Sequence, residues 1–195
     1  MELVTLEEQH FKTACRKLAE KVQHMQFRPD VIIGICTAGV YVAEEMAKSY
    51  PDARVYSIRP LDNRPSSSRK WFAALFRMTP EWLLRKLRTF KETVRSTKKH
   101  TLSRKFEIPE EVKKLGKLNV LLVDDSVDGG STLGSAAKRL TALNPDITLF
   151  TATIAVTRRC AICKPDVSLY RPGTLVRYPW SVDFKPGHKY PTPKF

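Results

Sequence analysis

The chain has 195 residues, 42% of them apolar, which suffices for the core of one domain but is short for two. Its formal net charge is +14, and the stretch from Ser57 to Lys105 holds fourteen Lys or Arg against three acids. An apolar stretch at 147–156 has only ten residues, three of them threonine, which is far too short to span a membrane. We therefore expect a single domain, 1–195, with a basic insert and no transmembrane segment.

The N-terminus and the cysteines bear on cellular location. Residues 1–8 contain three acids, which is atypical of a signal peptide. Four cysteines are scattered through a chain without secretory features, and we expect reduced thiols and a cytoplasmic protein. They are Cys15, Cys36, Cys160 and Cys163. The last two form a single pair far from any histidine, which favours a structural role over a zinc site.

The N-terminal part of the chain has the pattern helix, strand, helix, strand. Residues 5–8 have the form of a capping box, and apolar residues then recur on one helical face: Phe11, Cys15, Leu18 and Val22. Residues 31–36 have the pattern of a buried strand. A helix at 40–50 is expected to end at Pro51, and residues 54–58 form a second strand.

Beyond the insert, which we place at 59–115, strands and helices alternate again. A strand is expected at 119–123, a helix carries Leu133, Ala136, Leu140 and Leu143 on one face, and a strand follows at 147–156. Strand-helix-strand units need right-handed crossovers between parallel strands. The expected fold is α/β with a Rossmann-like parallel sheet core and a basic helical insert or hood, and ligands in such sheets bind beyond the carboxyl ends of the strands.

The most informative segment follows the strand at 119–123. Two adjacent carboxylates, Asp124 and Asp125, end the apolar run, and Asp128 precedes a Gly-Gly-Ser-Thr turn that opens a helix. N–H groups of a glycine-rich turn at a helix N-terminus bind phosphate. Adjacent carboxylates accept hydrogen bonds from vicinal hydroxyls and hold hydrated Mg²⁺ through water. The pattern indicates a site for a phosphorylated sugar, with a buried strand and polar turn as the alternative.

This segment resembles the phosphoribosyl pyrophosphate (PRPP) motif of the type I phosphoribosyltransferases. The resemblance implies Mg²⁺-dependent transfer of a 5-phosphoribosyl group from PRPP to a nitrogenous base, with release of pyrophosphate. Asp124 and Asp125 would hold the ribose hydroxyls and, through water, Mg²⁺, while Asp128 would act as general base. The 5′-phosphate would be bound by Asp128, Gly129, Gly130, Ser131 and Thr132. Gly129 stands where the family usually has Thr.

A second loop, at 34–40, lies between the first strand and its helix. Within the resemblance, Thr37, Ala38 and Gly39 occupy the loop that grips pyrophosphate, often through a cis peptide. The family carries Lys or Arg followed by Gly-Gly there, so this chain lacks the basic side chain. A simple strand-to-helix connection is the alternative for this turn.

The segment 174–184 contains Pro-Trp followed closely by Asp, and it resembles the C-terminal segment of bacterial and archaeal purine (xanthine, hypoxanthine or guanine) phosphoribosyltransferases. The resemblance assigns Leu175, Val176 and Asp183 to the base site. Leu175 stands where an aromatic ring lies against the base, and Val176 where backbone hydrogen bonds hold it. The alternative makes Trp180 and Phe184 core aromatics that fasten the tail.

A purine enzyme also needs a cation near the exocyclic oxygen of the base. The resemblance places it just after the strand at 147–156, and Arg158 is the candidate, with Arg159 second. A pair of arginines at a strand end is equally typical of a solvated edge. The resemblance further implies a homo-oligomer and a place in purine salvage.

The insert departs most from a minimal enzyme of this family. Residues 69–77 interleave aromatic residues with cations, and residues 79–95 have a helical pattern whose apolar face is Leu83, Leu87, Phe90 and Val94. We expect a helical cap over the site; a nucleic acid or an acidic membrane surface is the alternative partner of its cations. The competing function is a PRPP- or nucleotide-sensing regulator that keeps the fold and binds nucleic acid through the insert.

Overall fold

The computed structural model describes residues 2–61, 104–159 and 161–195, and the helices predicted within 69–95 lie outside them. Twelve elements are defined in this part of the chain. They are β1 (Glu2–Thr5), α1 (Glu8–His24), β2 (Val31–Ile35), α2 (Ala38–Ala47), β3 (Arg54–Pro60), β4 (Phe106–Glu107), α5 (Glu110–Lys113), β5 (Asn119–Val127), α6 (Ser131–Leu143), β6 (Thr148–Val156), β7 (Val167–Ser168) and β8 (Thr174–Arg177).

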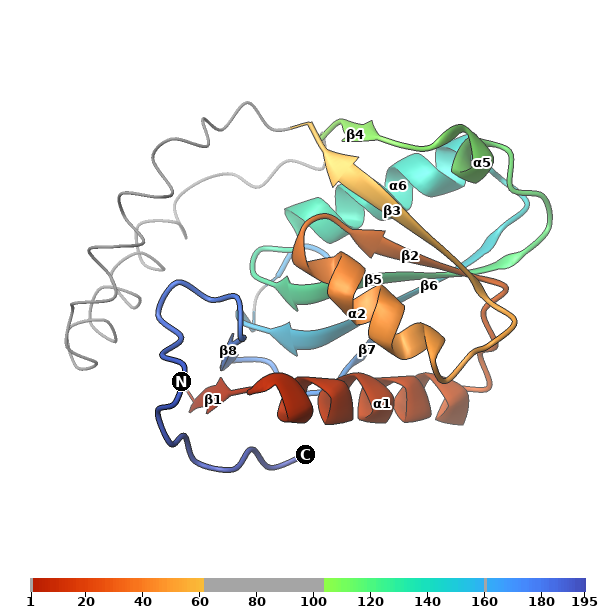
Figure 1. Ribbon diagram of the computed structural model, residues 1–195. Helices are drawn as coiled ribbons and strands as arrows, with labels where there is room; N and C mark the ends of the chain where they lie inside the picture. Colours follow the sequence, from red (N-terminus) through yellow and green to blue (C-terminus); the bar gives the residue numbers. More distant parts are fainter. Residues whose placement is uncertain (1, 62–103, 160) are drawn as a thin grey trace.

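The central sheet has the order β4-β3-β2-β5-β6-β7 (Figure 1). All neighbouring strands from β3 to β7 are parallel, and only β4 runs antiparallel, against β3. The parallel α/β core predicted from the alternating pattern is therefore confirmed. The carboxyl ends of β2, β5 and β6 lie at the same edge of the sheet, and the loops that follow these strands meet there.

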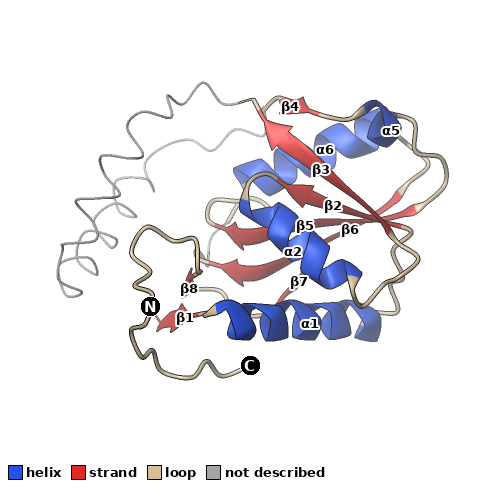
Figure 2. Cartoon of the chain, viewed as in Figure 1, coloured by secondary structure: helices blue, strands red, loops and turns tan. Residues whose placement is uncertain are grey.

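Helices cover the two faces of this sheet (Figure 2), and an apolar layer lies between the sheet and the helices on each face. Successive residues of a strand point to opposite faces, so Ile32 and Leu121 pack against α1 and α2, whereas Ile33 and Leu122 pack towards α5 and α6. These side chains are fully buried. Each contributes about 1.5–3 kcal/mol relative to an exposed position, which makes the sheet a rigid base for the loops at its edge.

Helix α1 confirms one prediction and corrects another. Its apolar face is buried as expected, through Phe11, Cys15, Leu18 and Val22. The capping box is wrong: the helix begins at Glu8, Glu7 is the N-cap residue, and no side chain caps the N-terminus. Thr5 belongs to β1 instead, because its backbone pairs with β8 and its hydroxyl interacts with Arg177.

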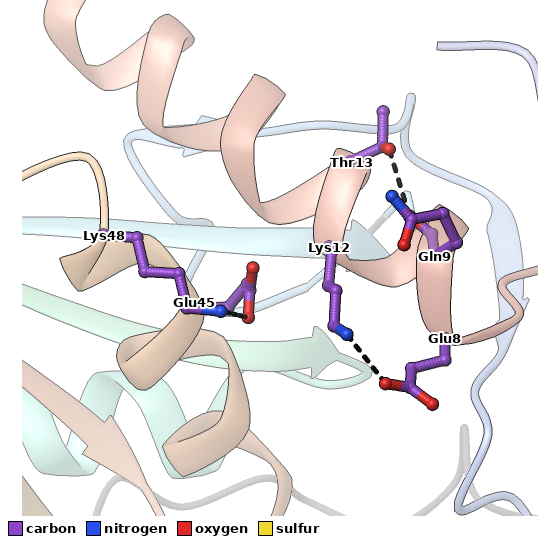
Figure 3. Close-up of polar contacts among 6 residues, drawn as sticks. All are labelled: Glu8, Gln9, Lys12, Thr13, Glu45 and Lys48. Atoms are coloured by element: carbon purple, nitrogen blue, oxygen red, sulfur yellow. Dashed lines mark hydrogen bonds and ion pairs between the residues drawn. The ribbon is translucent and has the colours of Figure 1, made fainter.

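The outward faces of α1 and α2 carry ion pairs. Lys12 binds Glu8 at 2.7 Å, and Lys48 binds Glu45 at 2.6 Å (Figure 3). In each pair one partner is well exposed, so each contributes only a few tenths of a kcal/mol, about 0.3–0.5 kcal/mol for pairs of this spacing. Packing of the apolar faces, rather than these pairs, holds the two helices on the sheet.

Three boundaries differ from the sequence expectation. Helix α2 spans Ala38–Ala47 and ends before Pro51 is reached. Strand β5 does not stop at the acidic residues: its pairing with β6 continues through Asp124 and Ser126 to Val127. The ends of the predicted insert belong to the core, since β4 pairs with β3 and Ile108 and Val112 are buried under the sheet.

A second sheet of two parallel strands, β1 and β8, lies beside the carboxyl edge of the main sheet. From here on, the name hood is used only for this sheet together with residues 178–184 that follow β8, and residues 59–115 are called the basic insert. The hood was not predicted, because its two strands are four residues long and stand at opposite ends of the chain. Within the described residues, no helix combines the length and apolarity needed to cross a membrane.

Candidate functional site

The candidate site lies where three loops meet at the carboxyl edge. The loop at 36–38 follows β2, the acidic residues Asp124 and Asp125 lie in the last part of β5, and the turn at 128–130 leads into α6. Because β2 and β5 are hydrogen-bonded neighbours, these segments are held close together. The sequence-predicted pyrophosphate, ribose and 5′-phosphate residues are thus brought to one edge.

The loop after β2 packs directly on the acidic pair. Its peptide bond between Cys36 and Thr37 is cis, and α2 begins at Ala38. A Cβ atom at Gly39 would lie 2.8 Å from the carbonyl oxygen of Val123 and 3.2 Å from a carboxyl oxygen of Asp124. Only glycine allows this approach, and it places the N-terminus of α2 against the carboxylate.

The two acids share a confined environment. The backbone N–H of Asp125 donates to Oδ1 of Asp124 at 2.9 Å. Burial and the neighbouring charge of Asp125 raise the pKa of Asp124 well above its usual range. Burial also raises the pKa of Asp125, and hydrogen bonding, chiefly with the side chain of Asp124, opposes this shift. Two carboxyl groups in such a place favour a ligand that supplies hydroxyl donors or a cation.

A direct metal site of three or more acidic, histidine or cysteine side chains is absent from the residues that the structure describes. Two carboxylates alone suit a hydrated cation, which they reach through its water molecules. The donor set therefore fits the indirect Mg²⁺ role that the sequence suggested for Asp124 and Asp125.

The turn at 128–130 places the N-terminus of α6 at this edge of the sheet. Gly130 is the N-cap residue with φ of 80°, in the left-handed region, and it has no side chain that could cap the helix. Thr132 is partly exposed in the first turn, whereas Ser131 is buried. This geometry is typical of a helix N-terminus that binds phosphate.

Gly130 is also fixed by its neighbour. A Cβ atom there would lie 2.2 Å from the carbonyl oxygen of Cys163, and Ile162 donates its N–H to the carbonyl of Gly129 at 3.0 Å. Residues 161–163 therefore pack over the back of the turn. The described cysteines, Cys15, Cys36 and Cys163, are free thiols; Cys160 lies outside the described residues.

We expect Gly130→Ala to lower the free energy of unfolding by about 2–4 kcal/mol, because a left-handed backbone costs an L residue roughly 1–2 kcal/mol and overpacking adds roughly 1–3 kcal/mol. Urea denaturation measures the change. Gly116→Ala is the matched control, since no described atom lies within 4 Å of a Cβ atom at that position. Equal midpoints for the two variants would contradict the predicted contact.

Asp128, the predicted general base, binds Arg158, the cation that was predicted to contact the nucleobase. Nε of Arg158 donates to Oδ1 of Asp128 at 2.7 Å, and the hydroxyl of Thr157 donates to the same oxygen at 3.0 Å. Thr157 and Arg158 follow β6, next to β5 in the sheet. Within the described part of the chain, Nη2 of Arg158 is buried and lacks a hydrogen-bond partner. Arg159 is exposed and lies against Gly173.

The other predicted base-site residues lie in the hood. Leu175 is partly exposed, and Val176 is buried in register with Val4 of β1. Asp183 is buried and accepts a hydrogen bond from Nε of Arg177 at 2.7 Å. This contact with Arg177 joins β8 to the segment that follows it.

Sequence reasoning missed the partners that the hood supplies to β5. The hydroxyl of Tyr178 donates to the backbone carbonyl of Asp125 at 2.7 Å and lies 3.0 Å from Oγ of Ser126. The ring of Trp180 stacks on Tyr178 and contacts Tyr41 of α2. The Pro-Trp motif indicated a role for Trp180, but no local sequence pattern predicted that Tyr178 would contact β5.

No family model and no curated protein sequence matches this chain. Solved structures do. A purine phosphoribosyltransferase from Pyrococcus horikoshii OT3 is 20% identical, with a TM-score of 0.62 over 97% of this chain and 100% of that one. A xanthine-guanine-hypoxanthine phosphoribosyltransferase from Helicobacter pylori is 17% identical, with a TM-score of 0.63 over 92% and 94% of the two chains.

A hypothetical protein from Neisseria gonorrhoeae with bound ppGpp is also similar, at 15% identity and a TM-score of 0.56, over 92% of this chain and 89% of that chain. Likeness at these identities establishes the fold. The chain has the type I phosphoribosyltransferase fold, as the PRPP-like motif in its sequence indicated.

Proposed function

We propose that this protein is a Mg²⁺-dependent phosphoribosyltransferase that transfers the 5-phosphoribosyl group of PRPP to a 6-oxopurine. The observation that supports the reaction most directly is the meeting of an acidic pair with two loops that present N–H groups. Gly39 packs on Asp124, and the turn at 128–130 follows the same strand. This arrangement offers one anion site on each side of a diol site.

In the proposed reaction the bond from ribose C1 to pyrophosphate breaks, and a ring nitrogen of the base forms the new bond to C1. The ring nitrogen gives up its proton, and positive charge develops on the ribose as the leaving group departs. Asp124 and Asp125 hold the ribose hydroxyls in position. The loop at 37–39 holds the pyrophosphate, so catalysis comes chiefly from positioning and from charge stabilisation.

Asp128 is the proposed proton acceptor. Thr157 and Arg158 both bind its Oδ1, which fixes the orientation of the carboxylate at the end of β5. Bound Mg²⁺ would neutralise charge on the leaving pyrophosphate. Asp124 and Asp125 would hold that ion through water molecules, as oxygen ligands suited to a hydrated hard cation.

Arg158 supports the choice of a 6-oxopurine. Its Nε is held by Asp128, and its Nη2 is buried without a partner in the described residues. A buried N–H donor is costly unless an acceptor reaches it. An exocyclic carbonyl oxygen of the base supplies that acceptor, whereas the amino group of adenine supplies a donor. A site of this kind discriminates strongly against a base that leaves the donor unpaired.

The proposal is tested by incubating the protein with PRPP, Mg²⁺ and each of xanthine, hypoxanthine, guanine and adenine, while pyrophosphate release is followed. We expect turnover with one or more 6-oxopurines and little with adenine. Arg158→Met should remove this preference and lower kcat/KM for the oxopurine by roughly 10- to 100-fold, the effect of one lost charged hydrogen bond. Absence of turnover with every base would overturn the proposed function.

A nucleotide-binding regulator with the same fold is the second candidate. Two features favour it: the loop at 37–39 has no basic side chain, and Leu175 replaces a stacking aromatic. The similar protein from Neisseria gonorrhoeae was solved with bound ppGpp. Tight binding of PRPP or ppGpp without turnover, together with salt-sensitive binding of RNA through the basic insert, would favour this candidate.

A further inference from the structure

The chain after β6 is bonded to the turn that carries Asp128. Val127 and Val156, the last residues of β5 and β6, lie opposite each other in the sheet. The backbone N–H of Thr157 donates to the carbonyl of Val127 at 2.8 Å, which extends this pairing by one residue. Thr157 is also buried, with 8% of its surface exposed. Backbone pairing therefore fixes Thr157 beside the residue that precedes Asp128.

The Thr157 hydroxyl and the Arg158 guanidinium meet at the same oxygen of the Asp128 carboxylate. The hydroxyl oxygen lies 3.0 Å from Oδ1, and Nε of Arg158 lies 2.7 Å from it. A hydroxyl has one proton, and its other acceptor here, the carbonyl of Val127, is more distant at 3.3 Å. A carboxylate is also the stronger acceptor of the two. The Thr157 proton is therefore directed chiefly to Asp128.

These two donors differ in their remaining contacts. The buried Nη2 of Arg158 lacks a hydrogen-bond partner among the described residues, and the proposed function assigns it to the exocyclic oxygen of the base. The contacts of the Thr157 hydroxyl run to Val127 and Asp128, which belong to β5 and to the turn after it. The contacts of Arg158 therefore depend on which base is bound, whereas those of Thr157 are set by the protein itself.

We propose that Thr157 is a positioning residue that sets the rate of proton transfer to Asp128, whichever base is bound, whereas Arg158 sets the choice of base. This inference rests on the proposed function, and it separates the duties of two residues that hold one carboxylate oxygen. A general base acts only when it lies within hydrogen-bond reach of the proton that it accepts. The Asp128 side chain is 38% exposed, so a ligand can reach it, while a buried hydroxyl holds one of its oxygens.

Thr157→Val removes the hydroxyl and keeps the branched shape of the side chain. We expect kcat to fall about tenfold with every 6-oxopurine that the wild type accepts, because one hydrogen bond to a charged group is lost in the transition state. The preference for oxopurines over adenine should stay that of the wild type, in contrast to Arg158→Met. The Kd for Mg²⁺-PRPP, measured by calorimetry, should also be unchanged. Thr157→Ser keeps the hydroxyl and should recover most of the lost kcat.

Thr151→Val is the matched control. Thr151 lies in β6, is 8% exposed, as Thr157 is, and donates its hydroxyl to a carboxylate oxygen of Asp166 at 2.7 Å. Along an extended chain it lies roughly 20 Å from Thr157. Per folded molecule, as measured by urea denaturation, its kcat should equal that of the wild type. Equal losses of kcat in the two valine variants would overturn the proposal, because a general effect on the fold would then explain both.

A double-mutant cycle shows whether Thr157 acts through Asp128. In the Asp128→Asn variant the side-chain amide does not accept the proton, so adding Thr157→Val should change kcat by less than about twofold. A further tenfold loss there would show that Thr157 acts elsewhere and would overturn the proposal. If the wild type turns over a base and Thr157→Val is equally active, this inference alone fails. If the wild type turns over no base, the proposed function fails, and the role of Thr157 fails with it.

Discussion

Replacing both Asp124 and Asp125 by Asn should weaken binding of Mg²⁺-PRPP by on the order of a hundredfold or more, because two charge-assisted contacts are lost, each worth roughly 1.5–3 kcal/mol. Isothermal titration calorimetry with PRPP and Mg²⁺ measures the change. Asp146→Asn is the control, since Asp146 is exposed in the turn before β6, far along the strands from the site. Unchanged PRPP affinity in the double variant would remove the acidic pair from the site.

The double Asn variant should not have a lower free energy of unfolding than the wild type. The difference between the two should depend on pH, with a sign that follows from the raised pKa of Asp124. Burial and the charge of Asp125 raise the pKa of Asp124, so the folded state holds that proton more tightly than the unfolded state does. As pH rises from the usual carboxyl range towards neutrality, ionisation therefore favours the unfolded wild type. The stability of the Asn variant relative to wild type should grow over that interval, as thermal unfolding at pH 4 and pH 7 will show.

Arg177→Met should lower the free energy of unfolding by about 3–5 kcal/mol, because it removes the cation that binds the buried carboxylate of Asp183. The two side chains are 4% and 6% exposed, and Nε and Oδ2 lie 2.7 Å apart. The guanidinium also lies 5.3 Å from the ring centroid of Tyr190, which anchors the tail. Urea denaturation measures the loss.

A matched control comes from α1, where Arg16 binds Glu20 at the same distance of 2.7 Å with side chains 61% and 45% exposed. Arg16→Met should change stability by no more than about 0.5 kcal/mol, because solvent screens an exposed pair. Adding Asp183→Leu to Arg177→Met should recover much of the loss, since both charges of the buried pair are then removed. Equal effects of Arg177→Met and Arg16→Met would show that burial does not strengthen the hood pair.

The main sheet and its helices followed from local patterns. Apolar periodicity located β2, β3, β6, α1 and α6, because burial of each element leaves a regular trace in its own sequence. The same logic failed for β5. Its apolar run ends at Val123, but the paired strand continues through Asp124 and Asp125 to Val127. Aspartate is disfavoured in strands, so the sequence predicted an end at Asp124. Backbone pairing with β6 keeps Asp124 in the strand, although its side chain is unfavourable there.

Long-range contacts account for the rest. The motif at 124–132 could be recognised in the sequence because its residues are contiguous. The position of Arg158 near the site could be predicted from the strand that precedes it. That Arg158 would bind Asp128 depends on strands β5 and β6 being neighbours. The hood could not be predicted, since β1 and β8 are too short to show a period and their pairing joins distant segments. The contact of Tyr178 with Asp125 was therefore found only in the structure.

The pairing of β1 with β8 sets an order for folding during synthesis. Strand β1 is synthesised before the parallel sheet, and Thr174, the strand partner of Glu2, is made only after that sheet. Domains grow from the N-terminal side as the chain emerges, and contacts between distant segments form late. The nascent sheet therefore carries an open acidic edge, and Tyr178 reaches Asp125 only after all the described strands have been translated. Acquisition of ligand affinity should accordingly trail sheet formation during translation.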